Sequence, residues 1–219
     1  KAYRRAVELD PGHALAHNNL GSALSAKKNF KEARLAYERA LQADPNLTAA
    51  HANLGFLLWQ MKELEGAIRH CRKALELDPK DFAAHVNLGA ALHAKGDWQG
   101  ALQTLQTAAA LEPGNAITYA NMADIYLTRK EPDKAVPLWH KVLERNPRDL
   151  TTQMALAGAY LDKKEFDGAL KVLNEAVKNL PREVGLHQLR GFAWLRKEQY
   201  DQAVEAYRDG LKVAPTDEQ

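Results

Sequence analysis

A proline recurs every 34 residues along this chain, and no other feature constrains the fold as tightly. The recurring residues are Pro11, Pro45, Pro79, Pro113, Pro147, Pro181 and Pro215. A fixed period of about 20–50 residues is typical of repeat architectures, in which one small unit is stacked on its neighbours. The spacing predicts six complete units, residues 14–47, 48–81, 82–115, 116–149, 150–183 and 184–217. Residues 1–13 then form the second helix of a partial repeat, and residues 218–219 form a tail.

Each unit contains two segments whose apolar residues follow the i, i+3, i+4 spacing of an amphipathic helix. In the first unit they read ALAHNNLGSALSAK and KEARLAYERALQAD. A short polar turn, Lys27-Lys28-Asn29, lies between them, and the proline near the end of the unit stops the second helix from continuing. We therefore predict an all-α chain of antiparallel helix pairs.

Small residues recur at fixed places in both helices, where their lack of bulk lets the two backbones approach closely. They are Gly21, Gly55, Gly89, Ala123, Ala157 and Gly191 in the first helix, and Ala33, Ala67, Ala101, Ala135, Ala169 and Ala203 in the second. Larger residues such as Leu54 and Phe166 fill the space around them, so we assign both sets to the core.

Leu-Gly in the first helix, Ala and an aromatic residue in the second, and Pro at the end together resemble the tetratricopeptide repeat. The resemblance covers essentially the whole chain. It implies a right-handed superhelical α-solenoid whose first helices line a concave groove for a protein or peptide partner. The runs AHNNLG, AHANLG and AHVNLG are also similar to the repeats of protein O-glycosyltransferase targeting regions, although the sequence contains no transferase domain.

The resemblance implies that the sixth place of each unit faces the groove. Asparagine holds that place in four successive units, at Asn19, Asn53, Asn87 and Asn121, which we call the asparagine row. A carboxamide offers both a donor and an acceptor, so such a row can pair with the backbone of an extended peptide whatever its side chains. The alternative is that asparagine is simply common at this place and orders the backbone locally.

The remaining groove places are mostly uncharged, and charge enters only toward the far end. The predicted peptide-binding residues are Asn18, Asn19, Asn53, Phe56, Trp59, Asn87, His93, Asn121 and Asp124. Aromatic side chains such as Phe56 and Trp59 are enriched where partners bind, but packing between repeats is an equal alternative. Some repeats of this family clamp the carboxyl terminus of heat-shock chaperones with Lys and Arg, and those cations are missing here, which argues against that ligand.

Charge balance and single-residue chemistry argue against nucleic-acid binding and catalysis. Thirty Lys and Arg stand against 28 Asp and Glu and are interspersed with them. His17, His51, His85 and His187 recur one repeat apart, too far to share a metal ion, so we assign them to packing. The lone Cys71 excludes a cysteine-built metal site, and no phosphate loop or nucleophile motif is present, so we expect no cofactor.

These features predict a non-catalytic adaptor that binds an extended segment of a partner protein. Two alternatives stay open. One is a self-assembling structural scaffold of an envelope or secretion complex, whose copies would form a homo-oligomer through uncapped repeat ends. The other is the targeting region of a larger enzyme. Because no membrane-spanning run or signal peptide is seen, we expect a soluble protein, cytoplasmic or periplasmic, without direct membrane insertion.

Overall fold

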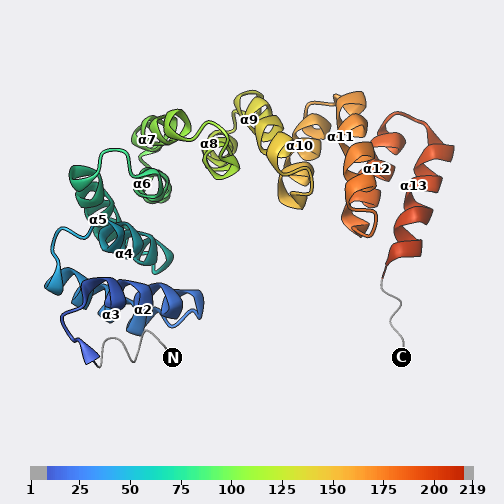
Figure 1. The fold of residues 1–219 in the computed structure, drawn as a ribbon. Coiled ribbons are helices and arrows are strands. Elements are labelled where there is room, and N and C mark those ends of the chain that lie inside the picture. The colour runs from blue at the N-terminus through green and yellow to red at the C-terminus, as the bar shows by residue number, and fades with distance from the viewer. Residues whose placement is uncertain (1–8, 215–219) are drawn as a thin grey trace. The chain divides into compact units, whose positions relative to one another are not determined.

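The computed structural model describes residues 9–214, and within this range the chain is all-α, with turns between the helices and no strand (Figure 1). The helices are α2 (Ala14–Ala26), α3 (Phe30–Ala43), α4 (Thr48–Gln60), α5 (Leu64–Leu77), α6 (Phe82–Lys95), α7 (Trp98–Leu111), α8 (Ala116–Thr128), α9 (Pro132–Arg145), α10 (Leu150–Asp162), α11 (Phe166–Asn179), α12 (Val184–Arg196) and α13 (Tyr200–Val213). Most of the predicted partial N-terminal repeat, Pro215 and the tail at 218–219 lie outside the described residues.

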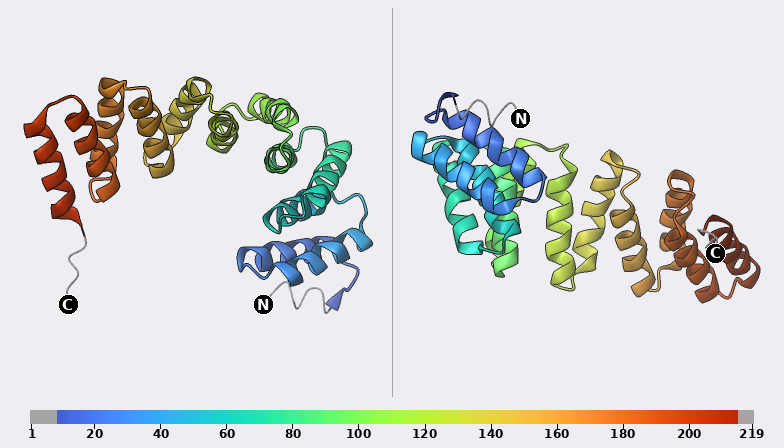
Figure 2. Two further views of the ribbon diagram at one scale, coloured as in Figure 1. Left: turned by 180° about the vertical axis from the view of Figure 1, so that it is seen from behind. Right: turned by 90° about the horizontal axis from the view of Figure 1, so that it is seen from below.

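Contacts between residues divide the chain into two compact units, residues 1–113 and 114–219, which we call the N-terminal and C-terminal units. Within each unit, an even-numbered helix and the odd-numbered helix after it run side by side in opposite directions (Figure 2). The next pair then stacks on the odd-numbered helix, as α4 does on α3 and α12 on α11. Each unit is thus a short solenoid of antiparallel helix pairs, as the sequence predicts.

The turn inside each pair depends on one residue with a left-handed backbone. In the first repeat this residue is Lys28, with φ 59°, and in the third it is Gly96, with φ 93°. A side chain at such a φ costs free energy, whereas glycine adopts it without strain. The remaining turns use Lys62, Lys130, Lys164 and Glu198.

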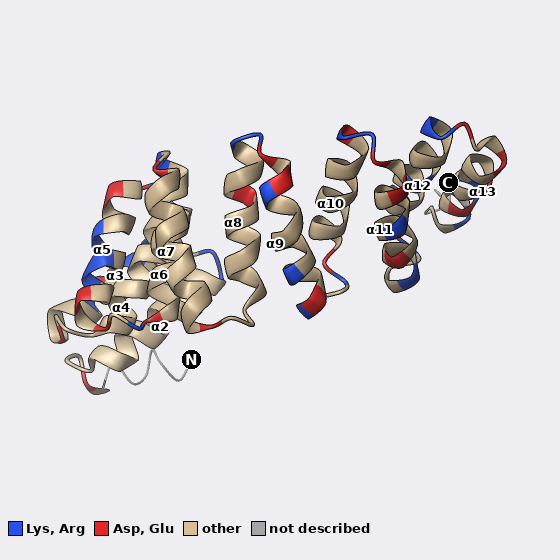
Figure 3. Cartoon of the chain, turned by 90° about the horizontal axis from the view of Figure 1, so that it is seen from above, with Lys and Arg blue, Asp and Glu red and all other residues tan. Residues whose placement is uncertain are grey.

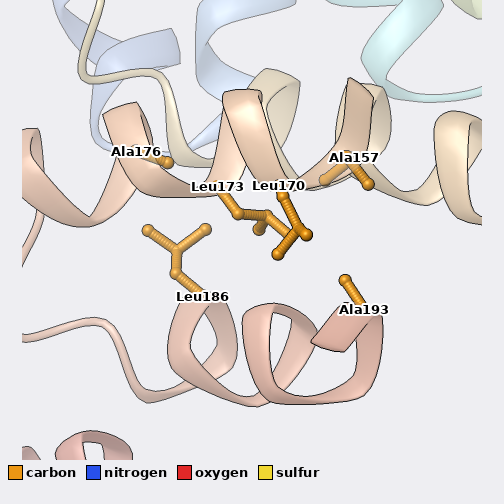
Figure 4. Close-up of a cluster of buried hydrophobic side chains, with 7 residues drawn as sticks. Ala157, Leu170, Leu173, Ala176, Leu186 and Ala193 are labelled. Carbon is orange, nitrogen blue, oxygen red and sulfur yellow. The ribbon is translucent and has the colours of Figure 1, made fainter. Parts of the chain in front are cut away.

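Two of the core clusters each join three consecutive helices, namely both helices of one repeat and the first helix of the next. Figure 4 shows Leu170 and Leu173 of α11 facing Leu186 of α12, and Leu173 and Leu186 are fully buried. Burying a leucine completely stabilises the fold by roughly 1.5–3 kcal/mol. A single helix pair could not bury these side chains, so each repeat depends on its neighbour.

The recurring small residues lie where the sequence places them, at the close contacts within each pair. A Cβ built on Gly55 would meet the Cys71 sulfur at 2.5 Å, and one on Gly89 would meet the Leu105 side chain at 2.6 Å. The second-helix alanines Ala33, Ala67, Ala101, Ala135 and Ala169 are all fully buried. The prediction that bulk is excluded at these places is therefore confirmed.

Candidate functional site

The first helices of the N-terminal unit present an almost uncharged surface. Among α2, α4 and α6 the sole charged residue is Lys95, at the end of α6. Figure 3 shows the charged residues mainly on the odd-numbered helices and in the turns, with both signs interspersed. Asp124, Asp162, Arg190 and Arg196 are the charged residues of the first helices in the C-terminal unit. A partner lying along α2, α4 and α6 would therefore meet polar and apolar groups rather than charge.

The asparagine row ties neighbouring first helices together. Asn53 Nδ2 on α4 donates to Asn18 Oδ1 on α2 at 3.0 Å, and it also lies 3.5 Å from the Ser22 hydroxyl oxygen. Asn18 is buried, and its own Nδ2 donates to Asn19 Oδ1 at 3.5 Å. The donor side of Asn53 is thus used within the protein, while its carbonyl oxygen has no hydrogen bond to any described residue.

The same arrangement is repeated one step along the unit. Asn87 Nδ2 on α6 donates to the backbone oxygen of Ala52 on α4 at 3.3 Å, and the Asn87 side chain stays partly exposed. Its Oδ1 likewise accepts from no residue in the range 9–214. Asn53 and Asn87 therefore combine the two readings left open by the sequence: the amide nitrogen orders the backbone, and the oxygen remains a free acceptor.

Phe56 and Trp59 form an aromatic pair on α4, beside the asparagine row. Their ring centroids lie 5.7 Å apart with an interplanar angle of 28°, which is a stacked arrangement. The Lys62 ammonium lies 6.0 Å from the centroid of the Trp59 ring. Because Phe56 is 39% exposed, the pair leaves apolar surface open as well as packing against itself.

The other predicted site residues are divided between the two units. Asn19 is exposed on α2, and His93 is partly buried in the last turn of α6. Asn121, partly buried, and Asp124, exposed, lie on α8 and so belong to the C-terminal unit. The structure therefore brings the predicted residues of α2, α4 and α6 into one unit.

The recurring histidines join each first helix to the proline that precedes it. His17, His51, His85 and His187 each place Nε2 within 2.9 to 3.0 Å of the oxygen of the proline six residues earlier. Since a carbonyl oxygen only accepts, Nε2 carries the proton and Nδ1 is left as an acceptor. Gln153 takes the histidine place in the fifth repeat, and its Nε2 donates to the Pro147 oxygen in the same way. The histidines thus have a structural role at the junction between repeats.

The remaining reactive groups do not favour catalysis. Burial raises the pKa of the Cys71 thiol to about 12, so it stays protonated and is a poor nucleophile. Over residues 9–214, no three His, Cys, Asp or Glu side chains gather closely enough to hold a metal ion. In the same range, none of the helices has both the length and the apolar composition needed to cross a bilayer.

Sequence analysis missed two cavities formed largely by the second helices. In the N-terminal unit a cavity of about 380 Å³ lies among α3, α4 and α5, and in the C-terminal unit one of about 350 Å³ lies among α9, α10 and α11. They occupy equivalent places three repeats apart. Both cavities have a glycine at the same repeat position, Gly66 and Gly168, where a Cβ would meet Leu58 at 3.1 Å and Tyr160 at 3.0 Å. Glycine alone does not predict a cavity, because Gly100 holds that position in the third repeat as well.

Two tetratricopeptide repeat family models match the chain, one over residues 1–48 and 121–184, the other over residues 58–122 and 92–138. No curated protein matches its sequence.

Several solved structures are similar in fold. PilF of Pseudomonas aeruginosa is 22% identical, with a TM-score of 0.75, over 98% of this chain and 95% of that one. YrrB, described as a TPR protein with an unusual peptide-binding site, is 20% identical, with a TM-score of 0.65, over 83% and 93%. A chain of the APC/C hetero-tetramer Cut9–Hcn1 is 18% identical, with a TM-score of 0.71, over 99% of this chain and 43% of that one. At these identities the likeness concerns the fold alone.

Proposed function

We propose that this chain, which belongs to the tetratricopeptide repeat family, is an adaptor that binds an extended segment of a partner protein along α2, α4 and α6. Repeats of this family generally mediate contacts between proteins, and the fold is typically a non-catalytic interaction module. The similar structure of YrrB belongs to a protein with a peptide-binding site, which supports the same class of ligand here.

The observation that carries the proposal is the free acceptor on Asn53 and Asn87. Their amide nitrogens are held by the first helix of the preceding repeat, so each carbonyl oxygen is fixed in place before a partner arrives. An extended peptide presents backbone N–H groups at regular intervals, and a fixed acceptor loses little entropy when it accepts from one. The exposed face of Phe56 adds apolar surface beside these acceptors. Uncharged segments should therefore be preferred over acidic or basic ones.

The test starts from random peptides displayed on phage and selected against the purified chain. The strongest binder is then synthesised with a fluorophore, and its affinity is measured by anisotropy. Asn53→Ala and Asn87→Ala should each weaken binding by roughly 0.5–1.5 kcal/mol, the contribution of one hydrogen bond, with helicity unchanged.

Asn18→Ala is the matched control. It removes the partner that holds Asn53, yet Asn18 itself is buried and offers no surface to a peptide. Because the Asn53 side chain is then less firmly held, the affinity should fall, but by less than in Asn53→Ala, which removes the acceptor itself. Equal losses in Asn18→Ala and Asn53→Ala, unchanged affinity in both Asn53→Ala and Asn87→Ala, or failure to select any peptide would each overturn the proposal.

A second candidate function, a self-assembling scaffold such as one in an envelope or secretion complex, is favoured by the apolar stripe on α13. The stripe consists of Tyr200, Val204, Tyr207 and Leu211, which are 61%, 47%, 36% and 76% exposed. The equivalent residues of α11 include Leu170 and Leu173, which α12 covers. A first helix of a second copy would bury the stripe of α13 in the same manner and give a homo-oligomer.

Light scattering after size-exclusion chromatography tests this second function. If it holds, the wild type should associate as its concentration rises, and Leu211→Glu should shift it to monomer. Gln202→Glu adds the same charge on an exposed residue of α13 outside the stripe and should leave association unchanged. A wild type that is monomeric at every concentration would exclude it.

A third possibility is that the chain is the targeting region of a larger enzyme. It rests on the likeness of AHNNLG, AHANLG and AHVNLG to the repeats of protein O-glycosyltransferases. The full-length open reading frame decides it, because a catalytic domain in the same frame is required.

A further inference from the structure

A row of four charged residues runs beside the apolar stripe of α13, one position further around the helix. Its members, all exposed, are Asp201, Glu205, Arg208 and Lys212, which we call the charge row. The row has the same i, i+4, i+7, i+11 spacing as the stripe, so both follow one side of the helix. Its two acids lie in the N-terminal half of α13, and its two bases lie in the C-terminal half.

The charge row is largely free to meet a partner. Among residues 9–214, the side chains of Asp201, Glu205 and Arg208 take part in no ion pair or hydrogen bond. Lys212 pairs with Asp209 of its own helix at 3.0 Å, but it is 73% exposed. An exposed pair of this kind contributes little, so Lys212 can turn to another carboxylate at small cost.

The stripe of α13 can pack against a second copy of itself. When two α13 helices lie antiparallel, Tyr200 of one copy meets Leu211 of the second copy. In the same alignment Val204 meets Tyr207 of the second copy, and the symmetry axis passes between Glu205 and Ala206. All four members of each stripe are then covered at once, in the alternating layers of an antiparallel helix pair.

The charge row is complementary to itself in that same alignment. The acidic half of one copy lies beside the basic half of the other, so Asp201 comes near Arg208 and Lys212 of the second copy. Glu205 lies close to the symmetry axis and within one turn of Arg208 of the second copy. A parallel pair would place acid beside acid and base beside base, which favours the antiparallel arrangement.

The first helices fit the stripe less well than α13 does. Four of them, α4, α6, α10 and α12, already pack on the second helix that precedes them. Of the other two, α2 contains no Asp, Glu, Lys or Arg, and α8 contains only Asp124. Neither can therefore pair with both halves of the charge row.

The order of charges also distinguishes α13 from the other second helices. At the equivalent places α5 has Glu65, Arg69, Arg72 and Glu76, which on reversal would set acid beside acid. Among the second helices α3, α5, α7, α9, α11 and α13, two acids followed by two bases occur at these places in α13 alone. The self-complementary order thus coincides with the exposed stripe.

We propose that two copies of this chain pair through α13, antiparallel, stripe on stripe and charge row on charge row, as a closed two-fold dimer. The proposal rests on the second candidate function, self-association through the stripe, and assigns α13 rather than a first helix as the surface that covers it. Because each copy uses the same surface, association stops at two. One helix face buries less than the roughly 1,200 Å² typical of stable interfaces, so the dimer is weak.

The test measures sedimentation of the full chain over a wide range of concentrations. The wild type should pass from monomer to dimer without larger species. Two charge variants are compared with it: a basic variant, Asp201→Lys with Glu205→Lys, and an acidic variant, Arg208→Glu with Lys212→Glu. Each should dimerise at least tenfold more weakly than the wild type, because its row then repels its own copy.

An equimolar mixture of the two variants is the decisive measurement. Their rows are opposite in charge along the whole length, so a heterodimer should form at least as tightly as the wild-type dimer. Its formation also shows that both variants are folded. The matched control is Glu144→Lys with Glu175→Lys, which makes the same change in charge on exposed residues of α9 and α11 and should dimerise like the wild type.

The outcomes separate this dimer from the scaffold. A wild type that stays monomeric at every concentration would overturn both. Growth beyond two copies would overturn the closed dimer and leave a scaffold built through a first helix. A dimer that neither charge variant weakens, a control that weakens it equally, or a mixture that forms no heterodimer would overturn the pairing through α13.

Discussion

The cavities of the two units are built on the same backbone but lined with different chemistry. Leu41, Leu54 and Gly66 of the N-terminal cavity are repeated as Leu143, Leu156 and Gly168 in the C-terminal one. Around this shared frame, the N-terminal cavity has Glu38, Arg69 and His70 where the other has His140, Lys171 and Val172.

The rims differ in their electrostatics as well. In the N-terminal unit Arg34 bonds Glu38 at 2.9 Å and Glu63 at 3.0 Å, so ion pairs border the cavity. In the C-terminal unit valine, Val136, takes the place of Arg34. The acceptor near the N-terminal cavity, His51 Nδ1, is paired with His70, whereas Gln153 Oε1 near the C-terminal cavity has no partner among the described residues. The comparison teaches that the repeat fixes where a cavity forms, while a few variable side chains decide which chemical groups line it.

The largest expected effect concerns how tightly the two helices of a pair pack, at one glycine in each unit. Gly55→Ala brings a Cβ within 2.5 Å of the Cys71 sulfur and 3.2 Å of the Ala67 oxygen. Although alanine is a better helix former, this overlap should destabilise the fold by about 1–3 kcal/mol in urea unfolding. Gly158→Ala, where the added Cβ meets nothing within 4 Å, should instead stabilise it by up to about 1 kcal/mol. Similar effects of the two changes would mean that the contacts within the pairs relax freely.

The next test makes the N-terminal cavity resemble the C-terminal one. His70→Val removes the donor to His51 Nδ1 and leaves a buried acceptor unpaired. It should cost about 1–2 kcal/mol of unfolding free energy. The reciprocal change, Val172→His, should not destabilise the chain, because it pairs Gln153. Urea unfolding of both variants measures the difference, and a neutral His70→Val would show that the histidine contact contributes nothing.

The same histidine predicts a pH dependence confined to the N-terminal unit. Burial, with smaller contributions from His51 and Arg69, lowers the pKa of His70 to about 4. In the unfolded chain a histidine titrates near pH 6.5, so between these values the unfolded state binds more protons. Stability is therefore full above about pH 6.5 and falls as the pH drops toward 4.

Between pH 7 and pH 5 this loss should be about 1 kcal/mol, after allowance for the partial exposure of the ring. Unfolding at both pH values measures it. His70→Val should lose correspondingly less stability over this range, and an identical pH dependence in the variant would contradict the assignment.

The smallest expected effect concerns the ion pairs of Arg34 at the rim of the N-terminal cavity. Arg34→Met breaks both bonds of Arg34, but all three side chains are more than 40% exposed. Exposed ion pairs contribute little, so the cost should stay below about 1 kcal/mol and shrink in 1 M salt. A larger cost that persists in salt would indicate that the hydrocarbon stem of Arg34 packs on the cavity wall.

Sequence alone predicts the stacked helix pairs of this protein, because their packing depends on residue patterns that can be recognised within a single repeat. The proline spacing, the helical periodicity and the small residues at Gly55 and Ala67 each act within a unit or between adjacent ones. Six copies of the same pattern then remove most of the ambiguity of a single one. The resemblance to the tetratricopeptide repeat adds the family, which the matched residues confirm.

The sites were harder to predict because they depend on pairs of side chains from different repeats. The position of Asn18 suggested a groove residue, but the bond from Asn53 and its burial could not be read from spacing. Likewise, Val172 and His70 differ plainly in the sequence. The consequence for hydrogen bonding follows only from the structure, in which His70 pairs with His51 while Gln153 Oε1 has no partner among the described residues.

The bond from each histidine, or from Gln153, to the proline six residues earlier bears on how such a chain can evolve. One added or deleted residue between the two partners would turn the side chain away from the carbonyl and break the junction. Small insertions are therefore selected against at this point. The length of the array can change readily only by duplication or loss of whole units, after which each copy is free to acquire its own cavity chemistry.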